Sequence, residues 1–286
     1  MDTFDKQPEI NYFPGHMAKA LKRIKEMVSS CDVAVLVLDA RAPLSSFPAG
    51  LDKLTEGKSR TVLMTKTDMA DPAATEKFLK HFRSKGYTAF SADLKVPSQA
   101  KGVRRALEDV RTSRDQKFLR QGFPLPPVKC LILGIPNVGK STLINVLGKR
   151  ERASVENVPG KTRKTTLFRA SERLWLYDTP GILEPRIHDK EAMTKLALLG
   201  SVKDDVLPHS LLVRRGLDLI GRLYPDLFKA RYGFLPSGNS DADMETLAKN
   251  RGFLLPGGKP DITRAERAFL QELKEGTLGR ITLDEC

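Results

Sequence analysis

The sequence predicts an α/β domain with a mostly parallel sheet over residues 1–184, followed by an all-helical domain over residues 185–286. Three observations support this prediction. Short β-branched runs alternate with helical patterns in the first part, which is typical of a parallel sheet covered by helices. A Gly-x4-Gly-Lys-Ser loop at residues 134–141 lies between a strand-like run and a helical run. After Pro185 no strand-like run remains, and helical patterns dominate.

The expected elements follow from hydrophobic periodicity and from turn residues. A helical pattern with Met17, Leu21, Ile24 and Val28 on one face follows an opening turn. The expected strands are residues 33–38, 61–64, 87–90, 128–133, 165–168 and 174–177. The other expected helices are residues 51–54, 73–85, 101–121, the run that begins near residue 141, 190–199, 210–223, 226–232, 241–251 and 263–275.

The charge of the chain predicts a polyanionic partner. The formal net charge is +13, and the sequence pI is about 9.7. Residues 185–286 carry 16 basic and 15 acidic side chains, so +12 of the excess lies in residues 1–184. A basic surface of this size is typical of nucleic-acid binding, although a generally basic protein without that role is the alternative.

Cysteine usage and hydropathy limit the cellular compartments in which the protein is expected. The three cysteines, Cys31, Cys130 and Cys286, are widely spaced and form no metal-binding motif, which suits a reducing compartment. No apolar run approaches the roughly 18 residues needed to span a membrane. The acidic N-terminal residues lack the apolar core of a signal peptide. We therefore expect a soluble, cytoplasmic protein with no membrane partner.

Residues 134–142 (GIPNVGKST) have the spacing of a phosphate-binding P-loop. In such a loop, backbone N–H groups and the N-terminus of the following helix surround an anion. Lys140 is expected to reach the β- and γ-phosphates, and the Ser141 hydroxyl is expected to ligate Mg²⁺. The expected phosphate-binding residues in this loop are Asn137, Val138, Gly139, Lys140, Ser141 and Thr142.

Residues 65–68 (TKTD) directly follow an expected buried strand and have the pattern of a guanine-reading loop. The Asp68 carboxylate can accept hydrogen bonds from N1–H and the exocyclic amine of guanine, groups that adenine does not supply. Thr65 stands where asparagine is commonest, and Lys66 is expected to lie along the base. Ser91 and Ala92, after the next expected strand, are the expected second guanine contact through a backbone N–H.

Two later segments are expected to sense the γ-phosphate. Thr162, in the polar and basic segment 149–164, is the candidate that completes Mg²⁺ coordination. Residues 178–181 (DTPG) follow an expected strand, where Asp178 would hold Mg²⁺ through water and the Gly181 N–H would meet the γ-phosphate. An ordinary loop threonine is the alternative for Thr162.

The order of these loops predicts a circularly permuted P-loop GTPase domain. The guanine-type loops precede the P-loop, whereas in an ordinary GTPase they come last. Such a permutation is tolerable because loop tips and termini of α/β domains lie at the surface. It makes the γ-phosphate-sensing strand lead directly into the helical domain, so nucleotide state can be transmitted there.

Five segments resemble the RbgA/YlqF family of circularly permuted GTPases: residues 13–19 (FPGHMAK), 39–46 (DARAPLSS), 134–141 (GIPNVGKS), 178–182 (DTPGI) and 278–283 (LGRITL). The resemblance implies a GTP-hydrolysing factor that acts late in assembly of the large ribosomal subunit and contacts rRNA through its helical domain. It further implies binding in the GTP state, release after hydrolysis, and a monomer off the ribosome. Mitochondrial relatives do the same on the organelle ribosome, so an organellar location stays open.

The residue that activates water is not evident from the P-loop motifs. Ile182 occupies the position where many GTPases place a water-orienting glutamine, and it cannot form a hydrogen bond. The resemblance implies a catalytic role for His16, whose imidazole can orient water near neutral pH. A histidine that only packs the N-terminal helix is the alternative. The resemblance also implies that Asn137 helps to hold K⁺, so intrinsic hydrolysis is expected to be slow without the ribosomal subunit and K⁺.

Two other classes of function remain as alternatives. One is an RNA-binding scaffold whose GTPase site senses nucleotide without catalytic purpose. The other is a P-loop kinase or ATPase, against which the guanine-selecting Asp68 argues.

Overall fold

A computed structural model of the chain describes residues 26–48, 50–110, 113–148, 167–179, 189–202 and 207–286. Within these residues, six strands form one sheet in the order β3-β2-β1-β4-β6-β5. All neighbours are parallel except β5 and β6, which are antiparallel. The strands are β1 (Val33–Asp39), β2 (Ser59–Thr65), β3 (Thr88–Ser91), β4 (Val128–Leu133), β5 (Leu167–Arg169) and β6 (Leu174–Tyr177).

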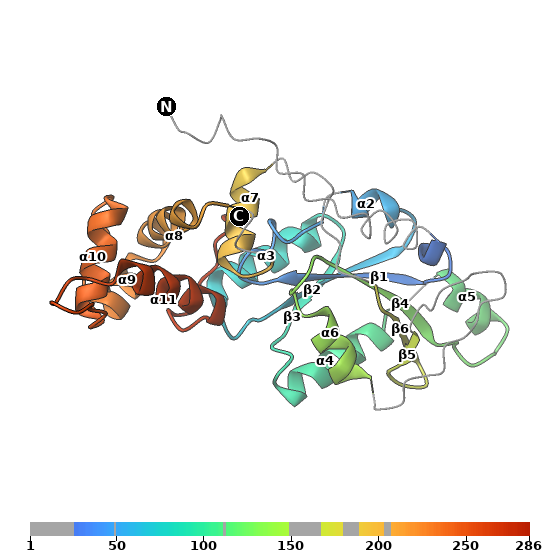
Figure 1. Cartoon of the computed structure of the whole chain (residues 1–286). Coiled ribbons are helices and arrows are strands. Elements are labelled where there is room, and N and C mark those ends of the chain that lie inside the picture. Colours follow the sequence, from blue (N-terminus) through green and yellow to red (C-terminus); the bar gives the residue numbers. More distant parts are fainter. Residues whose placement is uncertain (1–25, 49, 111–112, 149–166, 180–188, 203–206) are drawn as a thin grey trace.

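The central strand β1 is buried along its whole length because helices cover both faces of the sheet. Val33, Val35 and Val37 belong to one apolar cluster, together with side chains from α4 (Pro97–Glu108) and α6 (Lys140–Leu147). The alternate residues of β1 pack against α3 (Pro72–Ser84) on the other face. Figure 1 shows α3 on one side of the sheet and α4 with α6 on the other.

The predicted elements are confirmed with small shifts at their ends, and one prediction is wrong. The expected helix 101–121 is two helices, α4 and α5 (Ser113–Arg120). The first helix ends at the C-cap Asp109, whose N–H makes bonds to the carbonyl oxygens of Arg105 and Leu107. Sequence periodicity missed this end because both helices have basic outer faces. Of the expected N-terminal helix, residues 26–28 are helical and the preceding part lies outside the described residues.

The chain after residue 189 is helical, as predicted. Its helices are α7 (Lys190–Leu198), α8 (His209–Leu223), α9 (Pro225–Tyr232), α10 (Ser240–Asn250) and α11 (Ile262–Glu275). Aromatic rings of Phe228, Tyr232 and Phe269 fill the space between these helices, with ring centroids 4.7 and 6.1 Å apart for the two successive pairs. No helix among the described residues is long and apolar enough to cross a membrane.

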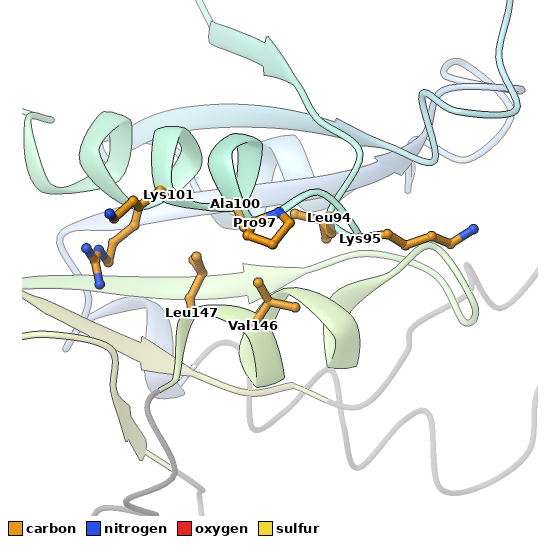
Figure 2. Close-up of a pocket in the computed structure, with 8 residues that line it drawn as sticks. Leu94, Lys95, Pro97, Ala100, Lys101, Val146 and Leu147 are labelled. Carbon is orange, nitrogen blue, oxygen red and sulfur yellow. The ribbon is translucent and has the colours of Figure 1, made fainter.

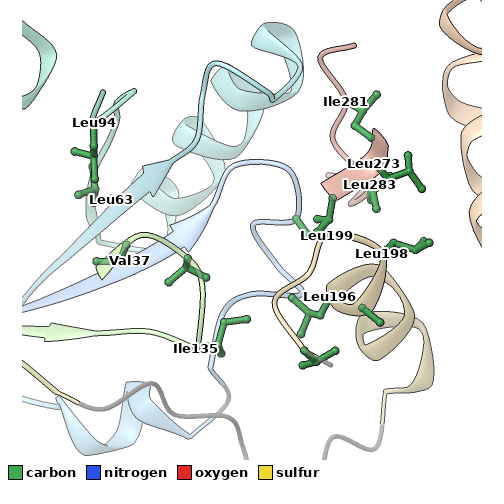
Figure 3. Packing of buried hydrophobic residues seen from close by; sticks show 14 of the residues in the cluster. Val37, Leu63, Leu94, Ile135, Leu196, Leu198, Leu199, Leu273, Ile281 and Leu283 are labelled. Carbon is green, nitrogen blue, oxygen red and sulfur yellow. The ribbon is translucent and has the colours of Figure 1, made fainter. Parts of the chain in front are cut away.

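The apolar core is continuous from the sheet into the helical region. Figure 3 shows Ile135 of the P-loop next to Leu196 of α7. Val37 of β1 belongs to the same apolar cluster as Ile281 and Leu199, which directly follows α7. Because the two parts share one core, the helical region is held against the carboxyl edge of the sheet. The expected division between residues 184 and 185 lies outside the described residues.

Candidate nucleotide-binding site

The backbone of the P-loop requires glycine at two positions. At Gly134 φ is 154°, and an added Cβ would lie 2.5 Å from the Val37 carbonyl oxygen of β1. At Gly139, the N-cap of α6, φ is 100°, and an added Cβ would lie 3.2 Å from Thr65 Oγ1. These glycines allow the loop to approach two neighbouring strands closely and place the N-terminus of α6 at the sheet edge.

Lys140 lies buried inside the P-loop. Its Nζ donates to the Ile135 carbonyl oxygen at 2.6 Å. Burial lowers the pKa of Lys140 to about 8, and the nearby Asp178 carboxylate partly opposes this shift. An anion bound in the loop would favour the charged form, so this lysine is suited to bind phosphate oxygens.

Two oxygen donors of the expected Mg²⁺ site are among the described residues. Ser141 is exposed in the first turn of α6, and Asp178 follows the end of β6. Burial raises the pKa of Asp178, while Lys140 opposes the shift. A hydroxyl and a carboxylate fit Mg²⁺, which prefers a few protein oxygens together with phosphate and water. The described residues contain no group of three or more His, Cys, Asp or Glu that could hold a metal by themselves.

Thr65 ties the guanine-type loop to the P-loop. Its buried hydroxyl donates to the Val138 carbonyl oxygen and also lies 3.1 Å from the Leu38 carbonyl oxygen. The side chain at this position therefore links the guanine-type loop to the P-loop. Threonine at position 65, where asparagine is commoner, can form this bond through its hydroxyl.

Lys66 has its ammonium group held by a buried carboxylate. Its φ is 58°, and its Nζ lies 2.8 Å from Oδ2 of Asp39 at the end of β1. Burial alone would raise the pKa of Asp39, but Arg41 and Lys66 hold that pKa below its usual value. Neither Asp39 nor Arg41 is predicted as a site residue from the sequence, although both lie in the segment 39–46 that resembles the RbgA/YlqF family.

Asp68 is partly exposed at the tip of the same loop. Its Oδ2 lies 2.9 Å from the Nζ of Lys95, a largely exposed side chain. Lys95 also lines a hollow of about 230 Å³ between α4 and α6, whose other lining residues include Pro97 and Val146 (Figure 2). The Asp68 carboxylate is thus already paired with Lys95, so a guanine base would have to share or replace this partner.

The expected contact through Ser91 and Ala92 meets a competing bond. The Ala92 N–H donates to the Met64 carbonyl oxygen at 2.9 Å, extending the pairing of β2 with β3. A bond from this N–H to a base would have to share or replace that one. The contact stays a prediction.

Asn137 connects the P-loop to the helical region. Its φ is 59°, and its Nδ2 donates to the Gly200 carbonyl oxygen, just past the end of α7, at 3.0 Å. Thr142 lies beside Ser141 in the first turn of α6 and is exposed. His16, Thr162 and Gly181 lie outside the described residues, so the structure does not place them relative to these loops.

The sheet order and these loops together define the class. The P-loop follows β4 in the middle of a mostly parallel sheet, and the guanine-type loop follows the earlier strand β2, two positions away. The two loops touch through Thr65 and Val138. The chain is a circularly permuted P-loop GTPase with a helical C-terminal region.

Sequence comparisons place the chain within a family. A family model described as "50S ribosome-binding GTPase" matches residues 129–219. Ribosome biogenesis GTPase A of Bacillus cereus is 34% identical over 96% of this chain and 93% of its own length. Mitochondrial GTPase 1 of Schizosaccharomyces pombe is 31% identical over 99% and 92% of the two chains. The chain belongs to the ribosome biogenesis GTPase A family.

Solved structures agree with this assignment. GDP-bound YlqF matches with a TM-score of 0.65 and 28% identity, over 92% of this chain and 98% of that one. GNP-bound YlqF from Thermotoga maritima matches with a TM-score of 0.64 and 28% identity, over 93% and 98% of the two chains.

Proposed function

We propose that this GTPase is an assembly factor that acts late in maturation of the large ribosomal subunit, binds the subunit and its rRNA with GTP, and leaves after hydrolysis. The names of the relatives and of the matching family model support a ribosomal role. The observation that carries the proposal is the bond between Asn137 and Gly200, at 3.0 Å. Because a phosphate-binding loop contacts the helical region directly, a change in that loop can alter how the region meets a partner.

A basic hollow on the helical region supports an RNA partner. It has a volume of about 500 Å³ and is lined by basic side chains beside the ring of Phe253, namely His209, Arg264, Arg267 and Lys274. The guanidinium of Arg264 lies 4.5 Å from the centroid of the Phe253 ring. Phosphate oxygens and unstacked bases suit cationic and aromatic groups placed together. The net charge of +13 adds long-range attraction to rRNA.

The proposed chemistry assigns a role to each expected site residue. Lys140 and the P-loop amides bind the phosphates, with the Gly181 N–H at the γ-phosphate. Ser141, Thr162 and Asp178 would hold Mg²⁺, which would supply positive charge next to the phosphoryl oxygens. Asp68 and Lys66 select guanine, with Ser91 and Ala92 as a further contact.

Two further roles concern the hydrolysis step. His16 orients the attacking water, because the segment after Asp178 offers isoleucine at the usual glutamine position. The carbonyl oxygen of the Asn137 amide would bind K⁺, while its nitrogen donates to Gly200. A cation there would supply the positive charge that other systems obtain from an arginine.

Co-sedimentation with separated ribosomal subunits tests the proposed partner. The protein should sediment with large subunits in the presence of a non-hydrolysable GTP analogue and much less with GDP. Replacement of Arg264 and Arg267 by Glu should weaken this binding, whereas replacement of Lys77 and Lys80 of α3 by Glu makes the same change in charge outside the hollow. Equal binding to both subunits in every nucleotide state would exclude the proposal. We expect the protein to be a monomer in the cytoplasm when it is not on the ribosome.

A further inference from the structure

The segment after α11 contacts residues 67–71, which are the end of the guanine-type loop (residues 65–68) and the turn that follows it. The Ile281 N–H donates to the Met69 carbonyl oxygen at 3.0 Å. The Asp71 N–H donates to Thr282 Oγ1 at 3.3 Å. At Gly276, the C-cap of α11, an added Cβ would lie 2.6 Å from the Met69 side chain. Residues 276–283, called the C-terminal strap below, thus hold the end of the loop and the turn after it.

Arg280 makes the most direct contact with this loop. Its Nη2 donates to the Thr67 carbonyl oxygen at 2.8 Å, and its Nε donates to the Ala70 carbonyl oxygen at 2.9 Å. These two acceptors lie on either side of Asp68 in the chain. A planar guanidinium fixes the distance between two acceptors in a way that an ammonium cannot.

The strap is itself anchored, so Arg280 is held in place. The Thr282 N–H donates to the hydroxyl oxygen of Tyr224 at 2.8 Å, and Thr282 Oγ1 donates to the Ala40 carbonyl oxygen at 3.1 Å. The Leu283 N–H donates to the Arg41 carbonyl oxygen at 2.6 Å. The strap therefore joins the helical region, the end of β1 and the guanine-type loop.

On this geometry we propose that Arg280 is a positioning residue for guanine recognition, which fixes the backbone on both sides of Asp68 so that its carboxylate meets the base. The proposal rests on the proposed assignment of residues 65–68 as the guanine-reading loop. Arg280 itself does not touch the base. Without Arg280 the loop would lose conformational freedom when nucleotide binds. This entropic cost would weaken the hydrogen bonds from the Asp68 carboxylate to N1–H and to the exocyclic amine of guanine.

Titration of the full-length protein with GDP and with IDP tests the proposal. Inosine lacks the exocyclic amine of guanine, so it loses one of the two bonds to the Asp68 carboxylate. Arg280→Ala should raise the Kd for GDP about tenfold, as expected from two charge-assisted bonds to the loop. The Kd for IDP should rise less, so the preference for GDP over IDP should shrink.

Two further variants distinguish a specific role of Arg280 in positioning Asp68 from a non-specific loss of nucleotide binding. Arg280→Lys keeps the charge but cannot bridge both carbonyls, so its GDP preference should lie between those of the native protein and Arg280→Ala. Arg222→Ala removes an exposed partner of Glu285, 2.6 Å away, and should change neither Kd. Unchanged affinities in Arg280→Ala, or equal losses for GDP and IDP in both Arg280 variants, would overturn the proposal.

A separate variant tests the assignment on which the proposal rests. In Asp68→Asn the amide can donate to the 2-oxo group of xanthine, so the variant should bind XDP better than GDP. If it does so while Arg280→Ala has no effect, the loop reads guanine and Arg280 is not needed. If Asp68→Asn leaves GDP binding unchanged, the assignment of the loop is wrong whatever Arg280 does.

Discussion

Arg41 and Asp39 form a buried ion pair at the end of β1, with Nη2 and Oδ2 2.8 Å apart. The same guanidinium donates to the carbonyl oxygens of Leu199, Leu273 and Lys274, at or near the ends of α7 and α11. A cation at the C-termini of two helices also interacts favourably with their dipoles. One side chain therefore holds the helical region against the strand that lies next to the P-loop strand.

Removal of this guanidinium should destabilise the fold strongly. Arg41→Met leaves the Asp39 carboxylate with one cation, Lys66, and removes the donor from three carbonyls. Breaking a buried pair costs about 3–5 kcal/mol. Urea unfolding followed by circular dichroism would measure the change in free energy.

Lys249→Ala is the matched control for Arg41→Met. Lys249 is an exposed lysine of α10 that lies 3.8 Å from Glu245 in the preceding turn. Its loss should change stability by less than about 0.5 kcal/mol. If Arg41→Met costs no more than this control, the buried network is not what stabilises the junction.

Nucleotide affinity should fall as the pH rises above the pKa of Lys140, which is about 8. Bound phosphate favours the charged ammonium, so the pKa rises on binding. Below that pKa, Lys140 is already protonated and pH has little effect; above it, binding must take up a proton, and affinity falls up to about tenfold per pH unit. Calorimetry between pH 7 and 9, in buffers of different ionisation enthalpy, would measure the number of protons taken up when nucleotide binds.

Lys140→Arg provides the control for this pH dependence. Its guanidinium stays protonated through the whole range, so its affinity should not show the same decline. The same slope in both proteins would assign the titration to another group.

His16→Ala should stop hydrolysis while leaving nucleotide binding intact. A residue that orients the attacking water contributes about 10²–10⁴-fold to the rate. Single-turnover GTP hydrolysis with large ribosomal subunits would measure the rate, and GDP titration would measure binding. His81→Ala is the matched control, since His81 lies on α3, away from the proposed phosphate site.

The same His16 variant separates the enzyme from the scaffold. An assembly factor released by hydrolysis should stay on the subunit when His16 is replaced. A scaffold that only senses nucleotide would leave the subunit at the native rate.

Substitutions of Asn137 should separate cation binding from the contact with the helical region. Asn137→Asp keeps an oxygen for K⁺ but removes the donor to Gly200, whereas Asn137→Ala removes both. Stimulation of GTP hydrolysis by K⁺ over Na⁺ should survive in Asn137→Asp and disappear in Asn137→Ala. If both variants keep the full K⁺ response, the cation binds elsewhere.

The sequence predicted the sheet and the loops that follow its strands because both depend on local patterns. The buried run at β1 and the glycines at Gly134 and Gly139 are visible within a few residues. Contacts between distant segments carry no such pattern. The bond from Asn137 to Gly200 spans 63 positions, and the bond from Arg280 to Thr67 spans 213. Local patterns therefore predict the residues that are expected to meet nucleotide, but they do not indicate the distant residues that hold those loops in place.

The position of the C-terminal strap has a consequence for the time at which the protein becomes active during its own synthesis. Translation delivers the guanine-type loop early, but the strap that holds it is encoded more than 200 positions later. Until the strap has left the exit tunnel of the ribosome that makes it, the loop lacks its outer contacts. Tight guanine binding should thus begin only after this segment is free to fold, so a half-made chain does not compete with finished molecules for GTP.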